Sequence, residues 1–241
     1  MINLVKRLRI FVGKRLHLPI RFAGTVPLYG QGLEDMYLLR IFQSKSTGYF
    51  VDVGANDGIF LSNTYALFRK GWRGLCIEPN PEAYGELVRH RQGDVCIQAG
   101  IGRTEQMGQL LWRKDLTEGS SFNMDLPARE QGCVVRVRTL TAVLDENKAP
   151  AEFDFLSIDV EGMELEVLGS LDWGRYKPRV VVLEYNSEGK IRREAFEFLI
   201  KLGYLPVVIN RWNVIMSCVW EQDSEKAHSG QGWYMLGKIR V

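Results

Sequence analysis

The sequence predicts an α/β fold with a mostly parallel central sheet, helices on both faces of the sheet and antiparallel strands near the C-terminal end. Short, continuously apolar strands alternate with helical periodicity over most of the chain, and consecutive strands replace this alternation after about residue 204. The composition agrees, because 241 residues with 46% hydrophobic and 25% charged side chains are typical of a globular protein with one sizeable core.

Residues 29–98 alternate between helix and strand. Apolar spacing between Met36 and Phe42 predicts a helix, and an apolar run that ends in glycine predicts a strand over 48–54. The pattern then continues with a helix over 63–70, a strand over 75–78, a helix through Tyr84, Leu87 and Val88, and a strand over 95–98.

The second half begins with a change of pattern. Helical periodicity lapses between 100 and 150, where alternating stretches at 109–113 and 134–138 predict an antiparallel excursion. Regular alternation then resumes, with a strand over 153–159, a helix from about 163 to 171, a strand over 180–184, a helix over 193–202 and three tail strands over 204–209, 214–219 and 233–239.

The N-terminal segment has a charge of its own. Six bases precede the first acid, Glu34, so the rest of the chain holds more acids than bases; the bases are Lys6, Arg7, Arg9, Lys14, Arg15 and Arg21. The chain therefore divides into a basic N-terminal arm, 1–28, and a single domain, 29–241. We expect no nucleic-acid partner, since the domain is acidic and no recognition motif follows the arm.

The arm is amphipathic when it is drawn as a helix that ends at Pro19. Its apolar residues fall on one side and Lys6, Arg7, Arg9 and Lys14 on the other. Two interpretations remain open. Such a helix can lie on an anionic membrane, with about 1 kcal/mol of attraction for each nearby base, or it can pack on its own domain.

Cysteine usage and hydropathy predict a cytoplasmic protein, with peripheral contact at the inner membrane face as an open possibility. The four cysteines form no C-x-x-C pair, and bases interrupt the apolar stretch that a signal peptide would need near the start. No apolar run approaches the roughly 18 to 20 residues of a membrane-spanning helix.

Four of the predicted strands end in a carboxylate: Asp52, Glu78, Asp159 and Glu184. Ligands bind beyond the carboxyl ends of parallel strands, where the strand order reverses. Gly54 and Gly58 let backbone approach a ligand, and Glu78 lies 20 residues after Gly58, a spacing that suits an acid bonded to ribose hydroxyls. These residues predict a nucleoside site.

The sequence lacks the motifs of dinucleotide-binding and phosphate-binding loops, and this narrows the type of nucleoside. Asn56 and Ile59 occupy positions where the dinucleotide pattern G-x-G-x-x-G requires glycine, and no phosphate-binding G-x-x-x-x-G-K-[ST] exists. Asp52 would also repel a pyrophosphate. It suits a cationic ligand that carries an amino group, such as the sulfonium and ammonium of S-adenosylmethionine.

Three motifs in order resemble the FkbM-type S-adenosylmethionine-dependent methyltransferases. They lie within 49–73, at Glu78-Pro79-Asn80-Pro81 and within 153–164. The resemblance implies a Rossmann-like class I methyltransferase fold with S-adenosylmethionine as cofactor. It assigns to the cofactor the residues Asp52, Gly54, Ala55, Asn56, Gly58, Glu78 and Pro79, with Gln98 and Ala99 as further candidates at the adenine edge. Ser157 and Asn186 depart from the family pattern, which puts the acceptor contacts in doubt.

Asp159 and Glu161 are the predicted catalytic residues. At the end of the fourth strand they would face the methyl group, where a carboxylate can orient or deprotonate an acceptor hydroxyl. Glu161 has a second interpretation, as an acid that favours the N-terminus of the following helix. Both could also bind Mg²⁺ together with Glu184, but we predict no metal, and we predict that His17, His90 and His228 lie at the surface.

The family resemblance alone suggests the acceptor. It implies an O-methyltransferase that acts on a sugar hydroxyl of a glycan or glycolipid precursor, or on a related natural product. Trp112, Phe122 and Trp212 are candidates to stack on a sugar face, although aromatic residues more often fill cores. The alternatives are a non-catalytic binding or scaffolding protein at the membrane surface and a nicotinamide-dependent oxidoreductase, which Asn56 and Asp52 disfavour. The sequence gives no oligomeric state.

Overall fold

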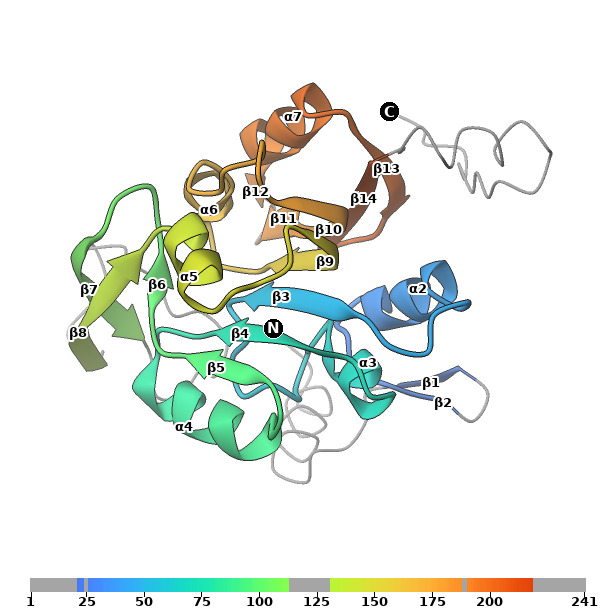
Figure 1. Cartoon of the computed structure of the whole chain (residues 1–241), viewed down its shortest axis with the longest axis horizontal. Coiled ribbons are helices and arrows are strands. Elements are labelled where there is room, and N and C mark those ends of the chain that lie inside the picture. The colour runs from blue at the N-terminus through green and yellow to red at the C-terminus, as the bar shows by residue number, and fades with distance from the viewer. Residues whose placement is uncertain (1–20, 24–25, 113–130, 188–189, 219–241) are drawn as a thin grey trace, which may run out of the picture.

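The computed structural model describes residues 21–23, 26–112, 131–187 and 190–218. A seven-stranded sheet crosses the molecule in the order β13-β14-β10-β9-β3-β4-β5 (Figure 1). Its strands are β3 (Tyr49–Val53), β4 (Arg73–Ile77), β5 (Val95–Ile97), β9 (Glu152–Ile158), β10 (Lys177–Glu184), β13 (Tyr204–Ile209) and β14 (Asn213–Cys218). The five strands from β5 to β10 are parallel and the last two pair antiparallel, which confirms the predicted sheet.

Helices cover both faces of this sheet, as a doubly wound fold requires. They are α2 (Glu34–Ile41), α3 (Tyr65–Arg69), α4 (Pro81–His90), α5 (Leu140–Glu146), α6 (Glu164–Leu168) and α7 (Arg193–Lys201). Side chains alternate across each strand. Val51 and Val53 therefore pack with α5, α6 and α7 on one face, while Phe50 packs with α2, α3 and α4 on the other.

Helix α5 corrects the expectation that helical structure lapses between 100 and 150. It has only seven residues, too few to show a clear period, and it depends on tertiary contacts. The Thr139 side chain accepts a hydrogen bond from the Ala142 amide at its start, and Leu140, Val143 and Leu144 are buried against the sheet.

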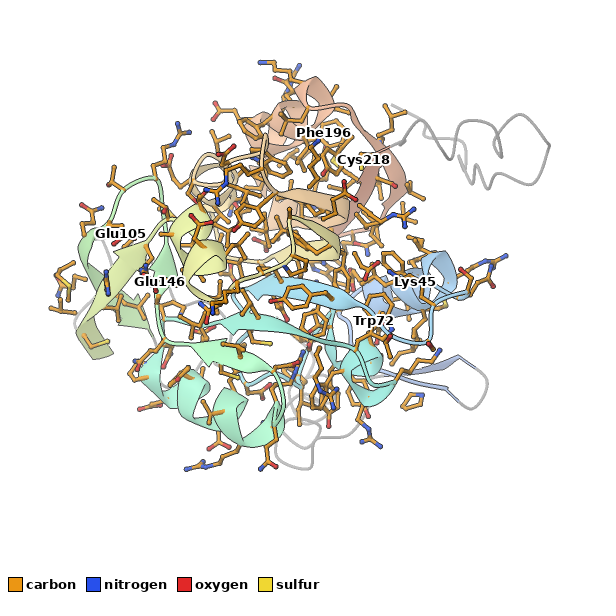
Figure 2. All side chains as sticks on the ribbon, in the orientation of Figure 1. Lys45, Trp72, Glu105, Glu146, Phe196 and Cys218 are labelled. Carbon is orange, nitrogen blue, oxygen red and sulfur yellow. The ribbon has the colours of Figure 1, made fainter. Side chains whose placement is uncertain are left out.

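The predicted antiparallel excursion is present as a three-stranded sheet in the order β6-β8-β7, formed by β6 (Gly100–Ile101), β7 (Gln106–Trp112) and β8 (Gln131–Arg138). Strands β7 and β8 are antiparallel, whereas β6 and β8 are parallel. Glu105 and Glu146 lie on this side of the molecule (Figure 2), and both pair with Arg138, which links β8 to α5.

Two small hairpins were not predicted. One consists of β1 (Arg21–Ala23) and β2 (Val26–Leu28), and the other of β11 (Asn186–Ser187) and β12 (Lys190–Ile191). The expected amphipathic helix before Pro19 and the expected strand over 233–239 lie outside the described residues, so the division into an arm and a domain stays a prediction. Among the described residues, no helix has the length and hydropathy of a membrane span.

The strand order reverses between β3 and β9. From β3 the chain proceeds outward through β4 to β5, and it later returns to the other side of β3 with β9 and continues to β10. Because ligands of such sheets bind at the carboxyl ends of the strands beside this reversal, the fold places the candidate site after Val53 and Ile158.

Candidate active site

Backbone hydrogen bonds hold the carboxyl ends of four adjacent strands together. The Gly54 and Ala55 amides donate to the Ile77 carbonyl at 2.9 and 3.0 Å. Glu78 donates its amide to Ile97, and Asp159 donates its amide to Val53, both at 3.0 Å. The predicted residues after β3, β4 and β9 therefore meet at one edge of the sheet.

The segment 54–64, which we call the glycine loop, makes a tight turn after β3. Gly54, Asn56 and Gly58 have φ angles of +86°, +50° and +79°, in the left-handed region that glycine and asparagine tolerate best. One carboxylate oxygen of Asp57 accepts hydrogen bonds from the Ile59 and Phe60 amides at 2.9 and 2.8 Å, which closes the turn.

Packing inside the protein demands both glycines. A Cβ atom on Gly54 would stand 1.8 Å from the carbonyl oxygen of Asp159. A Cβ atom on Gly58 would stand 2.7 Å from side-chain carbons of both Arg91 and Leu87. The sequence pattern of the two glycines predicts close approach of a ligand. The structure shows that they are also needed because neighbouring protein segments pack tightly against them.

Glu78 is buried at the end of β4 and bonded to the glycine loop. One carboxylate oxygen accepts the Asn56 amide at 2.9 Å and the other accepts the Asn80 amide at 2.8 Å. Burial raises the pKa of Glu78 to about 7, although the two amides oppose this shift. Each oxygen retains a second acceptor site, so the carboxylate suits a pair of ribose hydroxyls.

Asp52 is buried within the protein beside α3. The Thr64 hydroxyl donates to its carboxylate at 2.7 Å, and Ser157, its register partner on β9, also forms a hydrogen bond with it. Burial raises the pKa of Asp52, whereas the nearby Arg91 charge and the two hydroxyls lower it. The structure thus shows Asp52 bonded to protein groups, and a direct contact with a cofactor stays a prediction.

The two candidates for the adenine edge differ in exposure. Gln98 is exposed after β5, whereas Ala99 is 1% exposed and packs in the core with Val53 and Ile77. Gln98 is therefore the one whose side chain a ligand can reach. Ala55 is buried in the core on the opposite face of the sheet, and Pro79 lies between Glu78 and Asn80 at the start of α4.

Three carboxylates gather after β9 and β10. Oxygen atoms of Asp159, Glu161 and Glu184 all lie within 4.8 Å of one another. Burial raises the pKa of Asp159 well above its ordinary value, and the charges of Glu184 and Glu161 raise it further. Such a group can accept a proton readily, and its spacing would also suit a divalent cation; the absence of a metal stays a prediction.

Glu161 has a left-handed φ of +52° and is followed by Gly162 at +112°. The amide of Gly162 donates to Glu164 at 2.8 Å, so the start of α6 has an acidic partner of its own. This contact is compatible with both interpretations of Glu161, as a catalytic residue and as an acid that favours the N-terminus of α6.

Some side chains near the site were not foreseen. His90 is partly exposed, with a side chain that is 14% accessible, and its Nδ1 lies 2.8 Å from the Asp57 carbonyl oxygen, a contact with the glycine loop that the predicted surface position did not include. Arg91 is completely buried beneath the glycine loop.

Of the three aromatic candidates for sugar stacking, Trp212 lies beside the end of β10, where its carbonyl accepts the amides of Tyr185 and Asn186. The side chains of Trp112 and Phe122 lie outside the described residues.

The doubly wound sheet, with the glycine loop, the buried Glu78 and the carboxylates at its strand ends, has the architecture of nucleoside-binding α/β proteins. Comparison with protein families matches residues 52–206 to the methyltransferase FkbM domain. The chain belongs to this family. Its cofactor is accordingly S-adenosylmethionine, and the protein is an S-adenosylmethionine-dependent methyltransferase.

Solved structures that resemble the chain share little sequence with it. A TehB-like SAM-dependent methyltransferase from Corynebacterium glutamicum is 10% identical over 89% of this chain and 96% of its own, with a TM-score of 0.45. An O-methyltransferase from Bacillus cereus in complex with SAH is 13% identical over 90% and 91%, with a TM-score of 0.46. No curated protein matched the chain.

The residues present fit this cofactor. S-adenosylmethionine carries a sulfonium charge and a ribose diol, and the site offers the buried Glu78 carboxylate near the glycine loop and Asp159 beside it. When bound, the cofactor supplies an electrophilic methyl group. Carboxylates around it are favourable to a cation and would oppose a pyrophosphate.

Proposed function

We propose that this protein is an O-methyltransferase that transfers a methyl group to a hydroxyl on a sugar of a glycan or glycolipid precursor, or of a related natural product. The observation that carries the proposal is the position of Asp159. Its backbone packs directly against Gly54 of the glycine loop, and its carboxylate belongs to the cluster with Glu161 and Glu184.

This position suits proton removal from a hydroxyl. Transfer forms a bond between the acceptor oxygen and the methyl carbon as the carbon–sulfur bond breaks, so the hydroxyl proton must leave. The raised pKa of Asp159 makes its ionised form a stronger base than an ordinary aspartate, and Asp159 lies against the glycine loop, where we propose that the cofactor binds. Glu161 would orient the acceptor by accepting a second hydrogen bond.

Charge at the strand-end carboxylate cluster supports a neutral polyhydroxyl substrate. Three clustered carboxylates accept hydrogen bonds from hydroxyls but repel anionic acceptors. Trp212 lies with its backbone beside the end of β10 and has a partly exposed side chain, with the Arg211 guanidinium 5.3 Å from its ring centre, so its ring is a candidate for stacking on a sugar. These features favour a sugar over a phosphorylated or carboxylated acceptor.

The test is transfer of a labelled methyl group from S-adenosylmethionine to a panel of sugar acceptors. We expect wild-type protein to label hydroxyl oxygens and Asp159→Asn to lose at least about 100-fold in rate, the scale of general-base catalysis, while it still binds the cofactor. Glu166→Gln is the matched control, because Glu166 is an acid on the neighbouring helix α6 that pairs with Arg103 at the surface.

Label on nitrogen, or equal rates for Asp159→Asn and wild type, would contradict the proposal. Cofactor binding without transfer to any acceptor in the panel would favour the scaffolding interpretation. Both results are distinguishable from failure of the cofactor assignment, which would appear as no binding of S-adenosylmethionine at all.

The basic arm supports a location in the cytoplasm beside an anionic membrane, where lipid-linked precursors are found. Replacement of Lys6, Arg7, Arg9 and Lys14 by glutamine should lower recovery with anionic vesicles in a flotation assay, because each base near the surface contributes about 1 kcal/mol. Equal recovery of wild type with anionic and neutral vesicles would exclude this part of the proposal.

A further inference from the structure

Arg91 lies directly after α4 and is completely buried. Its Nη1 donates to the Gly58 carbonyl and to the Thr64 hydroxyl oxygen, both at 2.9 Å. Its Nε donates to Asp94 at 2.8 Å. One planar guanidinium therefore joins both halves of the glycine loop to the segment that leads into β5.

The guanidinium is enclosed by aromatic rings as well as by acceptors. Its central carbon lies 4.8 Å from the ring centre of Phe68 and 5.2 Å from that of Phe50. The stem of the same side chain fills the space that a Cβ atom on Gly58 would need. The loop and the Arg91 side chain therefore pack directly against each other.

The contacts continue from Arg91 to the sheet. Thr64 accepts from Arg91 and donates to Asp52 at 2.7 Å, and Asp52 also bonds with Ser157 on β9. Desolvation makes a buried guanidinium unfavourable unless charged partners and hydrogen bonds compensate it. The ion pair with Asp94 and the nearby charge of Asp52 supply this compensation, although Nη2 of Arg91 has no hydrogen-bond partner among the described residues. We expect loss of one of these links to let the loop rearrange.

We propose that Arg91 is a positioning residue for the cofactor, which sets the shape of the glycine loop through the Gly58 carbonyl and, through Thr64, the anchoring of Asp52. The inference rests on the proposed function, because it takes the glycine loop as the cofactor site. It assigns Asp52 an indirect role, in which its carboxylate anchors the glycine loop by accepting the Thr64 hydroxyl. It also explains why glycine is needed at 58.

Thr64→Val gives the mildest test, because valine has the same shape but lacks the hydroxyl that joins Arg91 to Asp52. We expect affinity for S-adenosylmethionine, measured by calorimetric titration, to fall about tenfold or more, since the change leaves buried polar groups unsatisfied. Thr141→Val is the matched control. Its hydroxyl also makes two hydrogen bonds, with Ser170 and Asp172, but on α5. This control should change affinity less than about twofold.

Arg91→Lys separates positioning from charge. Lysine retains the positive charge beside Asp94 but lacks the planar fork that reaches Gly58 and Thr64 together. We expect weaker cofactor binding and faster hydrogen exchange in peptides that cover 54–64, with exchange in α5 unchanged. A merely stabilising role would instead lower the melting temperature and leave cofactor affinity of the folded protein intact.

Two results would overturn the inference: full affinity in Arg91→Lys, or unchanged affinity in Thr64→Val. If wild type itself fails to bind S-adenosylmethionine, the proposed function fails, and hydrogen exchange of the glycine loop still tests the positioning role without ligand. Hydrogen exchange over 54–64 that is unchanged in both Arg91→Lys and Thr64→Val would then contradict the positioning role.

Discussion

Gly54 and Asp159 touch where the sheet reverses its order, and a Cβ atom on Gly54 would stand 1.8 Å from the Asp159 carbonyl oxygen. The two residues follow β3 and β9, which are neighbouring parallel strands. One belongs to the loop expected to hold the cofactor and the other to the carboxylate cluster expected to face the acceptor. Their contact therefore couples the two halves of the proposed reaction site.

Gly54→Ala should destabilise the fold by roughly 3 kcal/mol, because alanine disfavours a φ of +86° and its methyl group would overlap a backbone oxygen. Gly85→Ala is the matched control. Gly85 lies inside α4 with nothing near its Cβ position, so alanine should stabilise by about 0.5 to 1 kcal/mol. Urea denaturation measures both, and equal effects would show that the contact is unimportant.

Glu78 should make stability depend on pH. Its pKa is about 7 in the folded protein against 4.5 ordinarily, so the folded state retains this proton over a range where the unfolded chain has lost it. The contribution of Glu78 to the free energy of unfolding is therefore fully present below about pH 4.5. It falls by about 3 kcal/mol in all as the pH rises to about 7. Glu78→Gln should remove this dependence in urea denaturation from pH 5 to 8. A difference between variant and wild type that stays constant over this range would refute it.

Asp159→Asn should stabilise the protein at pH 8 even as it slows methyl transfer. The pKa of Asp159 is raised by burial and by Glu184 and Glu161, so ionisation in the folded state is unfavourable and stability falls as pH rises through that pKa. The advantage of the variant should grow with pH in thermal denaturation. Glu166→Gln, at the surface, should stay within about 0.5 kcal/mol of wild type at each pH.

The parts of the site that sequence reasoning reached are those with local signals. Short apolar runs located β3, β4, β9 and β10, and the acids at their ends followed directly. Parallel strands bring such ends to one edge, so the meeting of Glu78 with the glycine loop was predictable. The position of Asp159 and Glu161 at the same edge likewise followed from the predicted end of β9.

The parts that it missed depend on contacts between distant segments. Arg91 is completely buried, whereas Arg89, two residues earlier, has a side chain that is 70% exposed, and nothing in the local sequence separates them. Buried Glu34 bonds with Asn210, which is 176 residues away. Helix α5 was missed for the same reason, because its seven residues are specified by burial more than by periodicity.

The most direct test of the account is calorimetric titration of wild type and Glu78→Gln with S-adenosylmethionine, with NAD as comparator. We predict saturable binding of S-adenosylmethionine by wild type, no binding of NAD, and at least about tenfold weaker binding by the variant, because charge-assisted hydrogen bonds to the ribose are lost. Binding of NAD, or equal affinity of both proteins for S-adenosylmethionine, would contradict the assignment of this sheet edge as the cofactor site.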